Sequence, residues 1–295
     1  MNNRIFKSIL LIWLLIPISQ LSAQSVADPG FRFETERPRY KNGEGSLVLY
    51  DEGHNNPFTL KGQYAAFAQV LEADGYRLET NSQTITAESL MGARVFVTAN
   101  ALHDLDNWGA QAASAYTDEE VETLYDWVHQ HGGSLFLITD QMPAAGSASK
   151  LAARFGFKLI NGFAQRKDGQ TEIFSRSRGN LTANPVTDAA GFAIDSIRFW
   201  TGTGFVPPSE AIIVSSLGED YEVSLASDGS KISGKGLVNG AILPCGRGRV
   251  CLMADAGSFY ALLRGIKSEK RGMNHPDATE NAQFLLNILH WLDER

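Results

Sequence analysis

The sequence predicts an α/β protein built on a doubly wound parallel sheet, with a β-rich elaboration in its second half. Over residues 46–160, short apolar runs alternate with stretches of helical spacing, and the same alternation returns after residue 237. Between them, over about residues 161–235, Gly, Ser, Asp and Pro interrupt short extended runs. Strand–helix–strand alternation with short connections is typical of a parallel sheet. The middle segment therefore predicts an insertion rich in β-structure.

The first elements of the α/β pattern are predicted between residues 47 and 98. Residues 47–50 form an apolar run that predicts a buried first strand. An amphipathic helix that ends at Gly75 is predicted by four side chains at helical spacing: Tyr64, Phe67, Ala68 and Leu71. Strands are predicted at residues 76–80 and 95–98. The second of these lacks alternation, which indicates burial on both faces.

The clearest helix begins after Thr117. Thr117 and Glu120 form a capping box, in which each residue bonds a backbone N–H of the other. The helix is predicted to end at Gly132 and Gly133, and residues 135–138 read as the next strand. A further helix over residues 150–155 and a strand over residues 157–160 complete this part of the chain.

The α/β pattern returns with strands over residues 237–243 and 249–253. The last helix is indicated by helical spacing of Ala282, Leu285, Leu286 and Leu289. Cys245 and Cys251 flank the hairpin turn between the two strands. They could pair across the hairpin as a disulfide or lie apart as small buried hydrophobes, and the sequence leaves both open.

Residues 1–23 have the character of a signal peptide. Arg4 and Lys7 precede an apolar core, and Ala23 supplies a small residue at the expected cleavage point. We therefore expect an exported protein, periplasmic or secreted, with no membrane span after signal cleavage. An irregular leader over residues 24–45 and a single domain over residues 46–295 would follow. The formal net charge of −7 argues against nucleic acid as a partner. Protein partners are not indicated.

Polar side chains follow the ends of four predicted strands. The candidate ligand-binding residues are Asp51, Glu52, His54, Asn55, Asn100, Asp140, Gln141 and Asp255. In an open parallel sheet, the carboxyl ends of the strands form the edge where ligands bind. We expect His54 at the rim of the main pocket there, with Asp51 partly buried beneath it. Trp200 precedes a Gly-rich loop and could offer a stacking surface to a sugar ring.

Three interpretations of these residues remain open at this point. His54 could bind a metal with Asp51 or Asp140, although no metal-binding motif is present. Two of the carboxylates Asp51, Glu52 and Asp140 could form a general acid–base pair for glycoside or ester hydrolysis. Alternatively, Asp51 accepts hydrogen bonds from its own loop and His54 is structural. We expect no resident metal, because no metal-binding spacing motif is present, and no cofactor; a nucleotide is disfavoured because the glycines at positions 202 and 204 are not followed by a helix start.

Several motifs occur in an order shared with known proteins. They are Asp-Glu-x-His after the first strand, Ala99-Asn100-Ala101, the box Thr117-x-x-Glu120, Ile138-Thr139-Asp140 and Gly248-Arg249-Val250. The chain resembles the DUF4350 proteins and the GIFT-type domains of gliding-motility and intraflagellar-transport proteins, within the class I glutamine amidotransferase-like superfamily. The resemblance implies a flavodoxin-like three-layer fold.

The resemblance does not imply glutaminase activity. The matching strand ends carry Asn100 and Asp140, and neither has the nucleophilic Cys of true amidotransferases or a G-x-S-x-G elbow. Binding of sugars is a role proposed for related domains. We therefore expect an exported, non-catalytic module that binds a small polar ligand or carbohydrate at the carboxyl edge of the sheet. The alternative is a hydrolase that uses carboxylates or a metal there.

Overall fold

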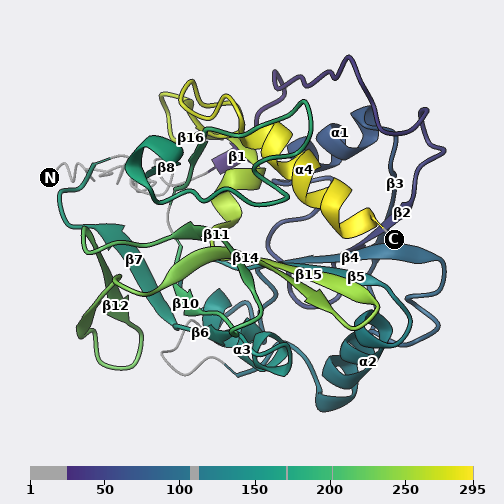
Figure 1. The fold of residues 1–295 in the computed structure, drawn as a ribbon, viewed down its shortest axis with the longest axis horizontal. Helices are drawn as coiled ribbons and strands as arrows, with labels where there is room; N and C mark the ends of the chain where they lie inside the picture. The colour runs from purple at the N-terminus through teal and green to yellow at the C-terminus, as the bar shows by residue number, and fades with distance from the viewer. Residues whose placement is uncertain (1–24, 107–112, 171, 201, 295) are drawn as a thin grey trace, which may run out of the picture.

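The structure, a computed structural model, describes residues 25–106, 113–170, 172–200 and 202–294. The predicted signal peptide lies outside the described residues. A nine-stranded mixed sheet forms the centre of the molecule (Figure 1). Five neighbouring strands run parallel, in the order β3 (Arg77–Asn81), β2 (Leu47–Asp51), β4 (Ala93–Ala99), β5 (Ser134–Ile138) and β15 (Gly248–Met253). The first predicted strand is thus an interior parallel strand, and the α/β class is confirmed.

The rest of the central sheet is antiparallel. β14 pairs with β15 through the predicted hairpin, and the sheet continues to β10 and β6, while β11 also pairs with β14. These strands span β14 (Val238–Cys245), β10 (Phe205–Val206), β6 (Lys158–Leu159) and β11 (Ile212–Ser216). The sheet is therefore mixed, and the expectation of a wholly parallel sheet is wrong, because the hairpin reverses the chain at β14 and the strands beyond it pair antiparallel.

Helices cover both faces of the sheet. The helices α1 (Ala65–Ala73) and α4 (Asn281–Asp293) share one core with Val48 and Tyr50 of β2. Leu49, which alternates with them, points into the second core, on the side of α2 (Asp118–His129) and α3 (Ala144–Arg154). Figure 1 shows α4 above the sheet and α2 and α3 below it. The chain thus forms three layers around two cores.

Three small sheets surround this body. The first contains β1 (Ser25–Ala27), β16 (Ala261–Arg264) and β17 (Glu269–Gly272). The second contains β7 (Gly162–Arg166), β12 (Tyr221–Leu225) and β13 (Lys231–Ser233). The third pairs β8 (Ile173–Ser175) with β9 (Ser196–Arg198). Short 3-10 turns lie at η2 (Arg176–Arg178) and η3 (Ala256–Phe259). The described part of residues 161–235 consists of short strands, loops and η2. The leader is not wholly irregular, because β1 pairs with β16.

The two cysteines are free thiols. In the register of the β14–β15 hairpin, Cys251 lies opposite Ile242 and Cys245 lies opposite Gly248. The two side chains are therefore not cross-strand partners, and Cys251 is a small buried hydrophobe.

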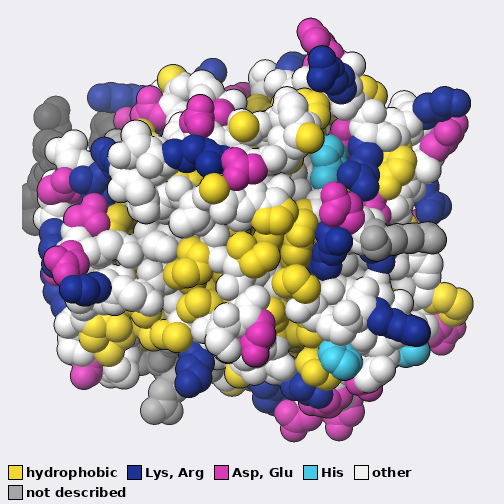
Figure 2. Space-filling model, viewed as in Figure 1, with side chains coloured by type: hydrophobic (Ala, Val, Ile, Leu, Met, Phe, Trp, Pro, Cys, Tyr) yellow, Lys and Arg dark blue, Asp and Glu magenta, His cyan; other side chains and the backbone are white. Residues whose placement is uncertain are grey.

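The surface is mostly polar. Figure 2 shows hydrophobic side chains gathered in the middle of one face, over the region of β11 and β14, with charged side chains around them. Ile212 and Ile213 of β11 are among the exposed hydrophobic residues. Within the described ranges, none of the helices has the length and apolar character that a bilayer crossing requires.

Candidate functional site

The predicted site residues lie at the carboxyl ends of four strands, but they form two separate groups. One group surrounds Asp51 at the end of β2, and the other surrounds Asp140 and Asp255 beyond β5 and β15. The first group is closed by hydrogen bonds among its own members. The second borders a pocket.

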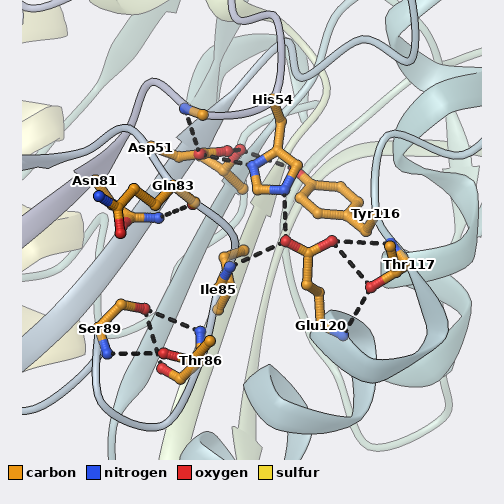
Figure 3. A network of polar contacts seen from close by, with 12 residues as sticks. Asp51, His54, Asn81, Gln83, Ile85, Thr86, Ser89, Tyr116, Thr117 and Glu120 are labelled. Carbon is orange, nitrogen blue, oxygen red and sulfur yellow. Dashed lines mark hydrogen bonds and ion pairs between the residues drawn. The ribbon is translucent and has the colours of Figure 1, made fainter.

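His54 connects two buried carboxylates in the first group (Figure 3). Its Nδ1 lies 2.8 Å from Oδ1 of Asp51, and its Nε2 lies 2.9 Å from Oε1 of Glu120. All three side chains are buried, and His54 is 7% exposed. The prediction of a histidine at a pocket rim is therefore wrong, because the loop folds back over the sheet and places the imidazole between Asp51 and α2.

Backbone groups and hydroxyls complete this network. Thr98 Oγ1 donates to Asp51 Oδ2 at 2.8 Å, and Gly53 N donates to Asp51 Oδ1 at 3.1 Å. Glu120 accepts from Ile85 N at Oε1 and from Thr117 N at Oε2, both at 2.9 Å. The predicted capping box is present, and Glu120 of this box also hydrogen-bonds His54.

The charges in this network support one another. Burial disfavours a charged imidazole, but the hydrogen bonds and charges of Asp51 and Glu120 outweigh it and raise the pKa of His54. For Glu120, burial is outweighed by the N–H groups of Thr117 and Ile85 and by His54, so its pKa is lowered. In a nucleophilic triad the second imidazole nitrogen faces a hydroxyl or thiol. Here it faces a second carboxylate, an arrangement that joins segments rather than activating a nucleophile.

Glu52 and Asn55 hold the same loop from outside. Glu52 Oε1 accepts from Leu60 N at 2.9 Å. Asn55 has a φ of 50° and is exposed, and its Nδ2 donates to the carbonyl oxygen of His103 at 3.0 Å. Both side chains thus tie the loop after β2 to its neighbours.

Asp255 organises the second group. It follows β15 and caps η3, accepting from Ser258 N at Oδ1 (2.9 Å). Its Oδ2 accepts from the backbone N of Trp200 at 2.7 Å. Asp255 therefore fixes the main chain at Trp200 over the carboxyl end of β15.

Asp140 lies close enough to Asp255 for their charges to interact. Burial and the charge of Asp255 raise the pKa of Asp140 well above its usual range, against smaller opposing effects of Gln141 N, Arg271 and Asn100. Asn100 adopts a left-handed backbone (φ 50°) at the end of β4. The Oδ1 of Asn100 and the Oε1 of Gln141 are buried without a hydrogen-bond partner among the described residues. This part of the edge is therefore polar, and its surroundings favour the protonated form of Asp140.

Glu172 and Arg271 belong to the same region, although sequence reasoning did not identify them. Burial, followed by the charge of Asp255, raises the pKa of Glu172 to about 8. The backbone oxygen of Glu172 accepts from Phe199 N at 2.8 Å, which places it beside Arg198 and Trp200. Arg271 lies on β17, and its charge lowers the pKa of both Asp140 and Glu172.

A pocket of about 550 Å³ opens beside this group. Its lining residues are Arg198, Trp200, Arg264, Glu269, Lys270, Arg271, His275 and Pro276. The Arg198 guanidinium lies 4.7 Å from the Trp200 ring centroid, and its Nη1 contacts Asp277 Oδ2 at 2.7 Å. Burial and the charge of Arg198 lower the pKa of His275, so this imidazole is neutral near pH 7.

Of the residues predicted for the site, Asp255 is the one bonded directly to a residue of the pocket wall, Trp200. Across the described ranges, no group of three or more His, Cys, Asp or Glu side chains is arranged to hold a metal ion. The basic residues of the pocket carried no sequence signal, because β16 and β17 have neither a long apolar run nor helical spacing.

Comparison with known proteins identifies the fold alone. No family model matches the sequence, and no curated protein matches it. Among solved structures, the mmIFT52 N-terminal domain is 14% identical with a TM-score of 0.59, over 84% of this chain and 98% of that one. The cytoplasmic protein STM1381 from Salmonella typhimurium LT2 is 11% identical with a TM-score of 0.50, over 85% and 100% of the two chains.

A putative ThuA-like protein from Bacteroides uniformis is also similar, at 10% identity and a TM-score of 0.45, over 88% of this chain and 94% of that one. The likeness to the mmIFT52 domain and to STM1381 shows a shared fold.

Proposed function

We propose that this protein is an exported, non-catalytic module that binds a small polar ligand, such as a carbohydrate, in the pocket beside Trp200. It would be a flavodoxin-like member of the DUF4350 and GIFT-type group. The observation that carries the proposal is the position of the pocket beside the carboxyl end of β15. Trp200 of the pocket wall is joined to that strand end by a 2.7 Å hydrogen bond from its backbone N to Asp255 Oδ2. That edge is where open α/β sheets bind ligands.

The pocket has the composition that a polar ligand needs. Its volume of about 550 Å³ lies within the usual range for small-molecule sites. Trp200 offers an apolar ring face, and the surrounding arginines offer hydrogen-bond donors. The neighbouring strand ends, at Asn100 and Asp140, bring no Cys or Ser nucleophile. These features favour binding over covalent chemistry.

Titration calorimetry with a panel of neutral and acidic monosaccharides tests this proposal. We expect at least one sugar to bind, and Trp200→Ala to weaken its binding by about tenfold or more, as loss of a stacking ring does. The matched control is Trp127→Phe, on α2 and away from the pocket, which should bind like the unmodified protein. Melting curves establish that both variants fold. Failure of every sugar to bind, or equal binding by Trp200→Ala, would refute the proposal.

A hydrolase is the second candidate, because burial and the charge of Asp255 raise the pKa of Asp140. A protonated carboxyl next to a carboxylate is the pairing that glycoside hydrolysis uses. Asp255, however, already accepts hydrogen bonds from Ser258 N and Trp200 N, so its oxygens are engaged. Turnover of 4-nitrophenyl glycosides that disappears in Asp140→Asn would favour the hydrolase over the binding module.

A further inference from the structure

We propose that the ligand of this pocket is an acidic carbohydrate, whose carboxylate or sulfate group is held by Arg271 and Arg198 while its ring packs against Trp200. This inference rests on the proposed function and adds the charge of the ligand. It follows from the charges of the pocket wall, the partners of those charges and the geometry of the arginines.

The pocket is basic in an acidic protein. Four cationic side chains and one carboxylate, Glu269, line it, whereas the chain as a whole has a formal net charge of −7. Three of the four cations form no ion pair with a described residue: Arg264, Lys270 and Arg271. A concave surface lined by one sign of charge concentrates ligands of the opposite sign.

The carboxyl groups behind the wall do not cancel this charge. Arg198 is the cation with a close partner, Asp277, at 2.7 Å. The charge of Arg271 acts on Asp140 and Glu172, but burial and the charge of Asp255 still raise both pKa values, that of Glu172 to about 8. Asp255 is buried, and its oxygens accept hydrogen bonds from Ser258 and Trp200. Arg271 therefore keeps much of its charge for a ligand.

The arginines also have unused hydrogen-bonding capacity. The Nε atoms of Arg198 and Arg271 are buried and have no hydrogen-bond partner among the described residues. A guanidinium presents its donors as a planar fork that matches a carboxylate or sulfate, and an unpaired buried donor is costly. Both side chains line the pocket, so a guanidinium that turns toward an oxyanion bound between them would gain a partner for its Nε.

Trp200 offers a ring-packing contact that an inorganic anion does not make. The Arg198 guanidinium lies over the Trp200 ring at 4.7 Å from the centroid, and the His275 ring lies 5.9 Å away, so the pocket joins an aromatic ring to a cationic wall. A sugar acid has both complementary features, an apolar ring face and an oxyanion. Inorganic sulfate has only the second, which gives the experiment a way to separate the two contributions.

Titration calorimetry with D-glucuronate, D-glucose and sodium sulfate, each on the full mature chain, tests the inference. We expect glucuronate to bind about tenfold or more tightly than glucose, the size of one charged hydrogen-bonding interaction. Arg271→Gln should remove that preference and leave glucose binding unchanged. The control Arg247→Gln, an exposed arginine in the β14–β15 turn, should have no effect on either sugar. Raising the salt from about 20 mM to about 500 mM should weaken glucuronate and not glucose.

Each other outcome has a definite meaning. Glucose that binds as well as glucuronate, with Trp200 required, would overturn the acidic ligand and leave the proposed function standing. Sulfate binding without either sugar would overturn the carbohydrate assignment. If none of the three probes binds, both the inference and the proposed function fail.

Discussion

At the scale of single residues, His54 shows how a polar loop residue becomes structural. It lies between two buried carboxylates, Asp51 and Glu120. Asp51 is three residues before His54 in the chain, whereas Glu120 is 66 residues after it. Its two ring nitrogens each hydrogen-bond one of these carboxylates, and their combined effect raises the pKa of the imidazole. Removing it leaves two buried carboxylates facing an empty space, and unpaired buried charge is among the most destabilising defects known.

We expect His54→Ala to lower the free energy of unfolding by about 3–5 kcal/mol, as loss of one partner from a buried ion pair does. Chemical denaturation followed by circular dichroism measures this change. The matched control is His103→Ala, an exposed loop histidine that bonds the Ser114 carbonyl oxygen at 3.0 Å. The control should cost less than about 1 kcal/mol. Equal losses for the two variants would contradict the structural role of His54.

At the scale of elements, the β16–β17 hairpin decides the character of the pocket. It supplies Arg264, Glu269, Lys270 and Arg271, and its position depends on a tight contact at its end. Gly272 ends β17 with a φ of 95°, and a Cβ there would collide with the backbone oxygen of Tyr260. Since the backbone of β16 and β17 is paired in register, that collision cannot be relieved without moving the strand.

Gly272→Ala should therefore destabilise the protein and weaken ligand binding together. Gly229→Ala is a suitable control, because Gly229 also has a positive φ (72°) but a Cβ there would meet nothing within 4 Å. The control should cost only the backbone penalty, about 1–2 kcal/mol. Gly272→Ala should cost more than this in thermal melts. If the two variants melt alike, the close approach at Tyr260 does not hold the hairpin in place.

At the scale of the whole molecule, the folded protein holds protons that the unfolded chain would release. The pKa of Glu172 is raised from 4.5 to about 8, and those of Asp140 and His54 are raised as well. Between the unfolded and folded pKa values, the folded state binds more protons, so stability falls as the pH rises. Glu120 acts in the opposite direction, because its pKa is lowered and its contribution is lost as the pH falls through that value. The shift of Glu172 by itself should therefore make stability fall as the pH rises from about 4.5 to about 8.

Glu172→Gln tests this sign. The groups that act most on Glu172 are Asp255 and three arginines, Arg166, Arg271 and Arg198. Above the folded pKa of about 8 the partly buried Glu172 side chain must ionise, whereas glutamine does not. We expect the variant to melt at a higher temperature than the unmodified protein at about pH 9, and to show a smaller difference at about pH 5. A melting difference that is constant across this range would show that Glu172 does not titrate abnormally.

Local sequence signals predicted the helices and the strands of the parallel half. The apolar run of β2 and the capping box of Thr117 and Glu120 each involve residues that are close together in the chain. Both can therefore be recognised from the sequence without a structure. Asp140 and Asp255 were placed at strand ends because each closely follows a predicted strand. Parallel topology then brings those ends to one edge of the sheet.

Only the tertiary structure decided which of these residues belong together. The sequence determined an α/β chain with polar strand ends, since periodicity and caps are local properties. It did not determine that Glu120 would meet His54, or that β17 would bring Arg271 to Asp140 and build a basic pocket around Trp200. Such contacts join segments far apart in the chain, and they depend on strand register and loop path, which no short stretch of residues encodes.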